Sequence, residues 1–253
     1  SCSLLRSSSA ASDVFKRRML NVASMMLGTY PEGVPEQFRL PVSATEDSRN
    51  LPRFIDRAGP AGVDVVGLSG SVVMDDFDHD GLLDLMVSSS GLRNQLRMFL
   101  NSGDGTFRDV TSKAGLTGLV GGLVLWQADY DNDGDLDVFV SRGAWQYHGF
   151  PNSLLRNNGD GTFSDITVEA GRGDEHPSHM MGWADFDADG WLDLFVGNES
   201  SRESGVRPSQ LFRNQRDGTF VDVSAEVGLN VTSFVKGAHW GDMDNDGHPD
   251  LFI

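Results

Sequence analysis

The stretch that decides the fold is DYDNDGDLDVFV at residues 129–140, followed by LLRNNGDGTFSDITVEAG at residues 154–171. The first part is a nine-residue segment with Asp at positions 1, 3, 5 and 9 and Gly at position 6, and it runs directly into an apolar stretch. The second part holds an Asp-Gly pair between two apolar runs. Such a pair is a strong β-hairpin signal, because Gly accepts the positive φ of a tight turn. The stretch therefore predicts short antiparallel strands joined by Asp-rich turns.

Both parts of this pattern recur along the chain. The Asp-rich segment begins at Asp76, Asp129, Asp185 and Asp242. Consecutive copies start 53, 56 and 57 residues apart, and the Asp-Gly-Thr-Phe segments keep the same order, ending at Phe107, Phe163 and Phe220. Four short strands in about 50 residues, repeated, are typical of the blades of a β-propeller.

We therefore predict an all-β fold in which residues 54–253 form a partial β-propeller of about 3.5 blades. The expected repeats are 62–116, 117–172 and 173–230, with an incomplete one at 231–253.

The residues before the repeats have a different character. Residues 1–12 are rich in Ser and Ala, so we expect a disordered tail. Residues 13–28 are expected to form an amphipathic helix, in which Phe15, Met19, Val22 and Met26 share a face. Residues 29–53 contain several prolines and are interpreted as a linker.

Composition limits the function classes. The 253 residues carry a net charge of −17, and the 37 acidic residues are 29 Asp and only 8 Glu. This charge argues against a nucleic-acid partner, which needs a basic face to displace counterions. No apolar run is long enough to cross a bilayer, so no transmembrane segment is expected. The single cysteine, Cys2, excludes both a disulfide framework and a cysteine-based zinc site.

The Asp-rich segments predict metal sites. Ca²⁺ takes 6–8 hard oxygen ligands, and acids at positions 1, 3, 5 and 9 can surround one ion while Gly at position 6 permits the turn. Without a cation, the clustered carboxylates would repel one another. We expect up to four Ca²⁺ ions, one per segment. The expected carboxylate ligands are Asp76, Asp78, Asp80 and Asp84; Asp129, Asp131, Asp133 and Asp137; Asp185, Asp187, Asp189 and Asp193; Asp242, Asp244, Asp246 and Asp250. The carbonyls at position 7 are those of Leu82, Asp135, Trp191 and His248.

An EF-hand is the obvious alternative, and the sequence rejects it. Its bidentate Glu belongs at position 12 of the loop. The residues at that position here are Val87, Val140, Val196 and Ile253. Each lies in an apolar run, so these loops are expected between two strands.

These motifs resemble the FG-GAP/VCBS repeat family, the calcium-loop blades of integrin α-subunit heads, and are especially similar to the cartilage acidic protein group and its bacterial relatives. The resemblance covers about residues 54–253. It implies a seven-bladed propeller with Ca²⁺ in loops on one rim, serving extracellular adhesion or recognition. The blade count of this chain is lower than seven. The C-terminal segment common in these relatives is not present in the sequence.

Other residues offer weaker candidates for binding. The loop at 142–151 is rich in aromatic residues and could contact a protein or glycan, or it could pack against the neighbouring blade. His176 and His179 follow two acids, but their spacing favours incidental loop histidines over a second metal site. The tryptophans before three of the Asp segments are expected in the blade core. They are Trp126, Trp183 and Trp240.

No motif of a known enzyme class is present, so we expect a non-enzymatic protein. The main hypothesis is a calcium-binding scaffold for adhesion or recognition, located outside the cell, on its surface or in the periplasm. The alternative is a carbohydrate-active enzyme, such as a Ca²⁺-dependent polysaccharide lyase, or its sugar-binding module.

Overall fold

The computed structural model describes residues 19–25, 27–39, 55–144, 149–171, 173 and 175–253. The chain divides into two compact units, Ser1–Ile55 and Asp56–Ile253. Within the described residues, no helix combines the length and the apolar character needed to cross a bilayer.

The first unit contains a helix over residues 19–25 and the 3₁₀ helix η1 (Glu36–Phe38). Its buried side chains include Asn21, whose Nδ2 donates to the Phe38 carbonyl at 2.8 Å, and Val34. In contrast, Met19 and Val22, expected on an apolar face, are 52% and 48% exposed. Phe38 belongs to the expected linker, so its bond with Asn21 shows that part of this linker packs on the helix.

Several expectations for this unit fall outside the described residues. They are the disordered tail at 1–12, the helix start with Phe15, residue Met26 and the linker residues 40–53.

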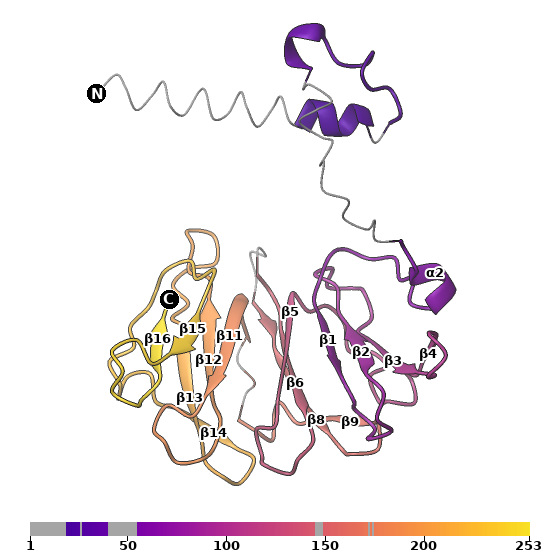
Figure 1. Cartoon of the computed structure of the whole chain (residues 1–253). Helices are drawn as coiled ribbons and strands as arrows, with labels where there is room; N and C mark the ends of the chain where they lie inside the picture. Colours follow the sequence, from indigo (N-terminus) through magenta and orange to yellow (C-terminus); the bar gives the residue numbers. More distant parts are fainter. Residues whose placement is uncertain (1–18, 26, 40–54, 145–148, 172, 174) are drawn as a thin grey trace, which may run out of the picture. The chain divides into compact units, whose positions relative to one another are not determined.

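The second unit is built from antiparallel sheets, one group of strands per repeat (Figure 1). Repeat 1 (62–116) forms a four-stranded sheet of β1 (Val72–Asp75), β2 (Asp84–Val87), β3 (Arg97–Asn101) and β4 (Phe107–Asp109). Repeat 2 (117–172) forms a sheet of β5 (Val124–Ala128), β6 (Asp137–Ser141), β8 (Ser153–Asn157) and β9 (Phe163–Asp165). Repeat 3 (173–230) forms a sheet of β11 (Ser178–Ala184), β12 (Asp193–Asn198), β13 (Gln210–Asn214) and β14 (Phe220–Asp222). Repeat 4 (231–253) forms a hairpin of β15 (His239–Gly241) and β16 (Asp250–Phe252).

Strand order follows chain order in every four-stranded sheet, so each repeat is a simple meander. This arrangement agrees with the expected blades, and the fold of the unit is mostly β. The register confirms the hairpin at each Asp segment, since Asp75 pairs with Asp84 and Ala128 pairs with Asp137.

Two features were not expected from the sequence. A short helix, α2 (Ala58–Ala61), precedes the first sheet. In addition, β7 (Phe150–Pro151) pairs with β10 (Glu175–His176), which links the end of the 142–151 loop to repeat 3. The aromatic residues 145–148 of that loop lie outside the described residues.

The sheets pack on one another through three apolar clusters. The first combines repeats 1 and 2 and includes Met86 and Val138, both fully buried. The second combines repeats 2 and 3, and Trp126 and Trp183 pack against it. The third joins repeat 3 to the last hairpin and includes Trp240 at its edge. The three tryptophans therefore contribute to the core, as expected.

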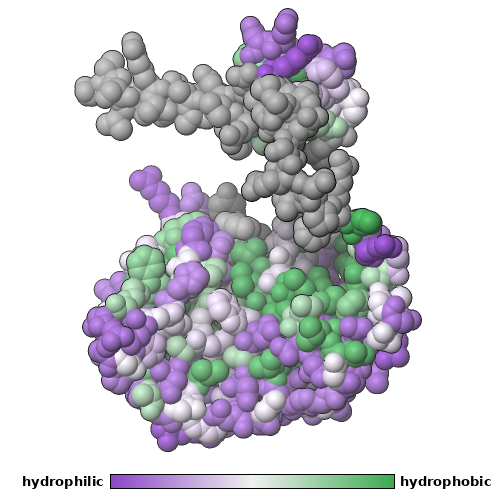
Figure 2. All heavy atoms as spheres, viewed as in Figure 1, coloured by the Kyte–Doolittle hydropathy of each residue, from purple (hydrophilic) through white to green (hydrophobic). Residues whose placement is uncertain are grey.

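Interior strands are buried on both faces, whereas the first strand is not. All residues of β6 and β12 are buried. By contrast, Val72 and Met74 of β1 are 57% and 53% exposed. Figure 2 shows apolar surface over the region of β1 and β5. Because β6 and β12 are covered on both faces, their sequences are apolar without the alternation of a half-exposed strand.

Neighbouring repeats are also joined by backbone hydrogen bonds at the outer strands. Phe163 N donates to the Ala114 carbonyl at 2.9 Å, and Phe220 N donates to the Ala170 carbonyl at 3.1 Å. The Ala of an Ala-Gly pair in one repeat thus accepts a hydrogen bond from the first residue of the fourth strand, β9 or β14, in the next repeat. Gly115 (φ +80°) leaves no room for a side chain, because a Cβ would lie 2.9 Å from the Phe163 carbonyl oxygen.

We expect Gly115→Ala to lower the free energy of unfolding by ~1 kcal/mol more than Gly118→Ala does. Both glycines have positive φ, but a Cβ at Gly118 would meet no atom within 4 Å, so this control carries the backbone strain alone. Urea unfolding of both variants in calcium buffer measures the difference. Equal destabilisation would show that the close approach between the repeats contributes nothing.

Candidate metal centres

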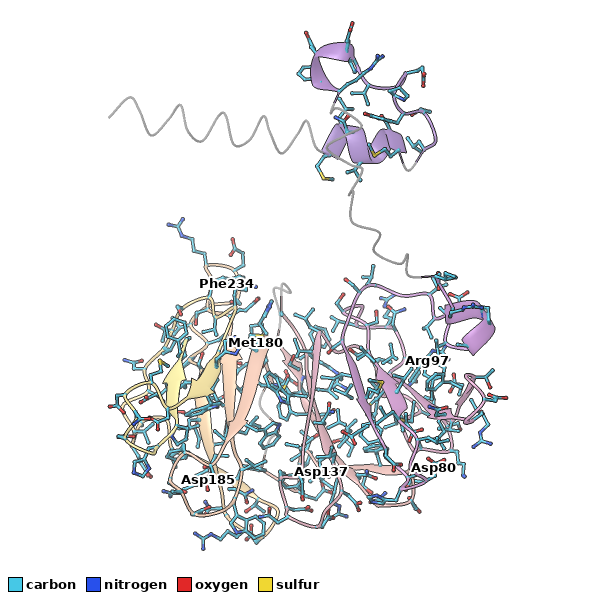
Figure 3. All side chains as sticks on the ribbon, in the orientation of Figure 1. Asp80, Arg97, Asp137, Met180, Asp185 and Phe234 are labelled. Atoms are coloured by element: carbon cyan, nitrogen blue, oxygen red, sulfur yellow. The ribbon has the colours of Figure 1, made fainter. Side chains whose placement is uncertain are left out.

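The four Asp segments form the loops between the first two strands of each repeat. We call them loop 1 (76–84), loop 2 (129–137), loop 3 (185–193) and loop 4 (242–250), and number their positions 1 to 9. Figure 3 shows Asp80, Asp137 and Asp185 toward the same end of the sheets, and Met180 and Phe234 toward the other end. Because each loop follows a strand of the same direction in its repeat, the meander places all four at one rim.

The backbone of each loop enters the left-handed region twice. Position 6 is Gly, with φ between 86° and 93°. Position 4 has φ between 57° and 63°, and its occupants are His79, Asn132, Ala188 and Asn245. Such φ values are rare for residues with a Cβ. The rest of the loop therefore holds position 4 in a backbone conformation that its own residue does not favour. It curls the loop and turns alternate side chains inward.

The carboxylate at position 1 closes the loop. Asp76 accepts hydrogen bonds from the backbone N–H groups of Asp80 at 3.0 Å and Gly81 at 2.8 Å. Asp129, Asp185 and Asp242 accept the same pair of bonds in their loops. Position 5 accepts the N–H of position 7, as in the 2.8 Å bond from Leu82 to Asp80.

The carboxylate at position 9 connects the loop to the third strand of its sheet. Asp84 is fully buried and accepts N–H groups from Phe77 at 3.1 Å and Asn101 at 2.8 Å. Asp137 and Asp193 make the equivalent pairs of bonds. Asp250 accepts the N–H of Met243 at 2.9 Å. Position 9 is therefore both a candidate ligand and a structural acceptor.

Three carboxylates converge in every loop. In each set, one oxygen per residue lies within 4.8 Å of the others. The sets are Asp76, Asp78 and Asp84; Asp129, Asp131 and Asp137; Asp185, Asp187 and Asp193; Asp242, Asp244 and Asp246. Of the sixteen predicted carboxylate ligands, twelve fall in these sets. The others are Asp80, Asp133, Asp189 and Asp250. The carbonyl role predicted for Leu82, Asp135, Trp191 and His248 stays a prediction.

Two of the converging carboxylates have an oxygen without a protein partner. Asp78 Oδ1 and Asp131 Oδ1 are buried, and neither makes a hydrogen bond. Leaving a buried acceptor unpaired costs about 1–3 kcal/mol, and more for a charged group. A hard divalent cation bound by the loop would satisfy these oxygens, so the donor set fits Ca²⁺. Zinc prefers nitrogen and sulfur ligands, which none of the four converging sets supplies.

Burial shifts the titration of the position-9 acids. It raises the pKa of Asp137 to about 8 and that of Asp193 to about 6, with smaller contributions from the neighbouring acids. The pKa of Asp84 is also raised, mainly by burial. The backbone hydrogen bonds to these carboxyls lower their pKa values but do not offset the cost of removing the charge from water.

Loops 1 and 2 are also held by residues of the next repeat. Asn214 Nδ2, from the Asp-Gly turn of repeat 3, donates to the Tyr130 carbonyl of loop 2 at 2.8 Å. Asn157 donates to the Phe77 carbonyl of loop 1 at 3.4 Å. Sequence reasoning missed this role, although the Asn that opens each Asn-x-x-Asp-Gly-Thr-Phe segment recurs at the repeat spacing.

The loops also contact one another. His79 of loop 1 pairs with Asp135 of loop 2, and Asn132 of loop 2 donates to the Gly190 carbonyl of loop 3 at 3.2 Å. In loop 3, Arg216 binds the Asp189 carboxylate. None of these contacts follows from spacing alone.

The histidine candidates lie at the other end of the sheets. His179, at the start of β11, contacts the buried Glu199 at 3.1 Å, and Lys236 pairs with the same carboxylate. Burial, together with Lys236, lowers the pKa of His179. The structure corrects the expectation of loop histidines, because His176 lies in β10 and His179 in β11.

Comparison with known proteins identifies the family. The model of the FG-GAP-like repeat matches residues 76–140, 129–196 and 185–253. The chain belongs to the FG-GAP-like repeat family. Each match begins at position 1 of one loop and extends beyond the next loop, so the matched unit spans two metal-loop hairpins.

Curated relatives point in the same direction. The chain is 31% identical to cartilage acidic protein 1 of Xenopus tropicalis over 171 residues and 31% identical to that of Mus musculus over 173 residues. It is 30% identical to that of Homo sapiens over 174 residues. Each alignment covers 64% of this chain, and the chain spans about a quarter of the length of these relatives.

Among solved structures, a lectin of Agrocybe aegerita that recognises non-reducing terminal N-acetylglucosamine shows a TM-score of 0.42 and 21% sequence identity. The alignment covers 73% of this chain and 47% of the lectin chain.

We expect the metal-free protein to lose stability as the pH rises from about 5 to about 8. Unfolded Asp has a pKa near 3.9, so above that value the unfolded chain releases protons that Asp137 and Asp193 still hold in the fold. The free energy of unfolding therefore falls with rising pH, and it stops falling once the pH passes the pKa values of the folded Asp193 and Asp137. Melting temperatures in chelator across this range measure the trend, and a rise with pH would contradict it.

Proposed function

We propose that this chain is a calcium-binding scaffold of FG-GAP-like repeats, non-enzymatic and extracytoplasmic, whose loops bind Ca²⁺ at one rim. The observation that carries the proposal is the convergence of three carboxylate oxygens within 4.8 Å in every loop, with Asp78 Oδ1 and Asp131 Oδ1 buried and unpaired. Four such sets at the repeat spacing point to a shared ligand, because one set alone could be an ordinary acidic turn.

Bound Ca²⁺ would supply positive charge and oxygen coordination at these sets. The protein itself provides the shape of each loop. In every loop, position 1 holds the backbone of positions 5 and 6. In loops 1 to 3, position 9 ties the loop to the third strand, and in loops 1 and 2 an Asn of the following repeat donates to a loop carbonyl. Because the loop shape is maintained by these bonds, binding requires little rearrangement and stabilises the turn between the first two strands.

The expected location follows from calcium supply. Extracellular calcium modules bind with dissociation constants of about 10⁻⁴–10⁻³ M, so such loops fill where calcium is abundant. We propose an extracellular, cell-surface or periplasmic setting on this ground. We also propose that the repeats belong to a closed propeller, which the packing of consecutive meander sheets supports. The resemblance to the repeat family implies seven blades.

The role of the scaffold is recognition of a protein or glycan. Loops at the rim opposite the metal loops differ most among the repeats, which is typical of surfaces that carry specificity on a constant framework. Glu199, which contacts His179 next to Met180, lies at that rim (Figure 3).

Removing calcium should lower the melting temperature by at least about 5 °C. A ligand at a hundredfold excess over its dissociation constant stabilises the folded state by about 2.7 kcal/mol per site, and 1 kcal/mol shifts the melting temperature of a domain of this size by about 2–4 °C. Calorimetry with EDTA and with calcium tests this, with Mg²⁺ as a control. An identical melting temperature in all three would refute the structural role of calcium.

Asp131→Asn should remove most of the calcium-dependent stabilisation from loop 2. The matched control is Asp160→Asn in the same repeat, because Asp160 is an exposed acid outside the loops whose Oδ1 caps Thr162. Both substitutions remove one negative charge and keep the side-chain shape. Calorimetric titration with calcium should therefore show one fewer ion, or one much weaker ion, for the first variant only. The same loss in both variants would assign the effect to net charge.

A sugar-binding module, or a lyase, is the second candidate. The observation in its favour is a groove of about 620 Å³ lined by Phe150, Arg142 and Asp165. Arg142 is only 7% exposed and donates to the carbonyls of Val120 and Pro151 at 2.7 and 3.0 Å. A glycan array and an ultraviolet assay for unsaturated products separate the possibilities. Product formation would overturn the non-enzymatic proposal, whereas binding without turnover would identify the ligand class.

A further inference from the structure

Loop 3 differs from the other loops in the turn that lies beside it. The turn between the third and fourth strands carries Gly103 in repeat 1 and Gly159 in repeat 2, with φ of 76° and 74°. Repeat 3 has Arg216 at this position, with φ of 63°. A left-handed backbone costs a residue with a Cβ roughly 1 kcal/mol, so a compensating interaction is expected.

That interaction is an ion pair with loop 3. Arg216 Nε and Nη2 lie 3.0 and 2.7 Å from Asp189 Oδ2, and Asp189 Oδ1 accepts the Trp191 N–H at 2.9 Å. Both oxygens at position 5 of loop 3 are therefore engaged by protein donors. Where the structure is described, no Lys, Arg or His pairs with the position-5 acids of loops 1 and 2, Asp80 and Asp133.

The guanidinium also acts on the converging carboxylates. Its pKa is raised, first by the hydrogen bond with Asp189 and then by the charge of Asp189, with contributions from Asp187 and Asp185. The last two residues belong to the converging set of loop 3. Arg216 therefore places a positive charge beside that set, whereas the glycines of repeats 1 and 2 place none.

We propose that Arg216 is a built-in counter-cation of loop 3, which makes this loop bind divalent cations more weakly than loops 1 and 2 and keeps its shape less dependent on them. The inference rests on the proposed calcium function. A cation held at position 5 repels an incoming divalent ion and occupies an oxygen that the ion would use. The four loops then fill in order of affinity instead of acting as equivalent sites.

The chain contains a reporter for loop 3. Trp191 occupies position 7 of this loop, whereas the other loops have Leu82, Asp135 and His248 there. Excitation of an indole beside a bound Tb³⁺ produces lanthanide emission, so Trp191 reports Tb³⁺ in loop 3. Other indoles also lie near the loops, since Trp126, Trp183 and Trp240 precede loops 2, 3 and 4. The loop 3 signal is therefore defined as the part of the emission that Trp191→Phe removes.

The experiment is a Tb³⁺ titration, followed by calcium competition, of the full chain and three variants. Arg216→Gly restores the residue of the other repeats, and Arg216→Gln removes the charge but keeps a side chain. The control is Arg97→Gln, which removes an exposed charge of β3 in repeat 1 whose partner is Asp109, at 2.7 Å. We expect both Arg216 variants to tighten loop 3 binding about tenfold, and the control to leave it unchanged.

The outcomes separate the inference from the proposed function. Absence of Tb³⁺ and Ca²⁺ binding in the unsubstituted chain would overturn the calcium proposal and this inference with it. Binding that keeps the same loop 3 affinity in both Arg216 variants, or becomes weaker, would overturn the inference alone. A change in Arg97→Gln equal to that in Arg216→Gln would assign the effect to net charge and would also overturn it. Circular dichroism of each variant verifies folding, and Arg216→Gln keeps the test valid if the glycine variant unfolds.

Discussion

Convergence of like charges is the constraint on which the rest of this structure depends. Each loop brings three carboxylate oxygens within 4.8 Å of one another at the start of a strand. Two unit charges 4 Å apart repel by about 4 kcal/mol at an effective dielectric constant of 20, so three of them oppose the loop shape strongly. Burial adds a second cost at position 9, because it is the main cause of the raised pKa values of Asp137 and Asp193. The fold repeats this cost four times, and the proposed Ca²⁺ ions would compensate it.

Two kinds of interaction within the protein offset the repulsion between the carboxylates: hydrogen bonds to the loops and the burial of apolar side chains between the sheets. Backbone N–H groups neutralise part of the charge at positions 1, 5 and 9, and the Asn side chains of the next repeat hold the loop carbonyls. The apolar clusters between the sheets supply the larger favourable contribution, since each fully buried large side chain gives about 1.5–3 kcal/mol. The sheets are therefore held by their cores, and the proposed cation would act on the loops alone. This division explains why the loop motif is strict while the opposite rim varies.

Much of this organisation is predictable from sequence because its signals are local. The Asp-Gly turns and apolar runs specify the strands, and the spacing of the Asp segments specifies one loop per repeat. The convergence of Asp76, Asp78 and Asp84 follows from alternation along a curled loop. Contacts between repeats could not be predicted, because they depend on the distance between sheets. The Asn214 bond to Tyr130 and the His79 pair with Asp135 belong to this class. In the first unit, Asn21 is buried through a bond to a distant carbonyl, which the apolar pattern of the helix does not reveal.

Counting bound ions by native mass spectrometry tests the central claim most directly. In a volatile buffer with calcium, the account predicts species that carry specifically bound Ca²⁺, up to four per chain, and their loss on chelation. A spectrum with no bound calcium at concentrations typical of extracellular fluid would contradict the account. The carboxylates would then be acidic turns that the backbone alone maintains.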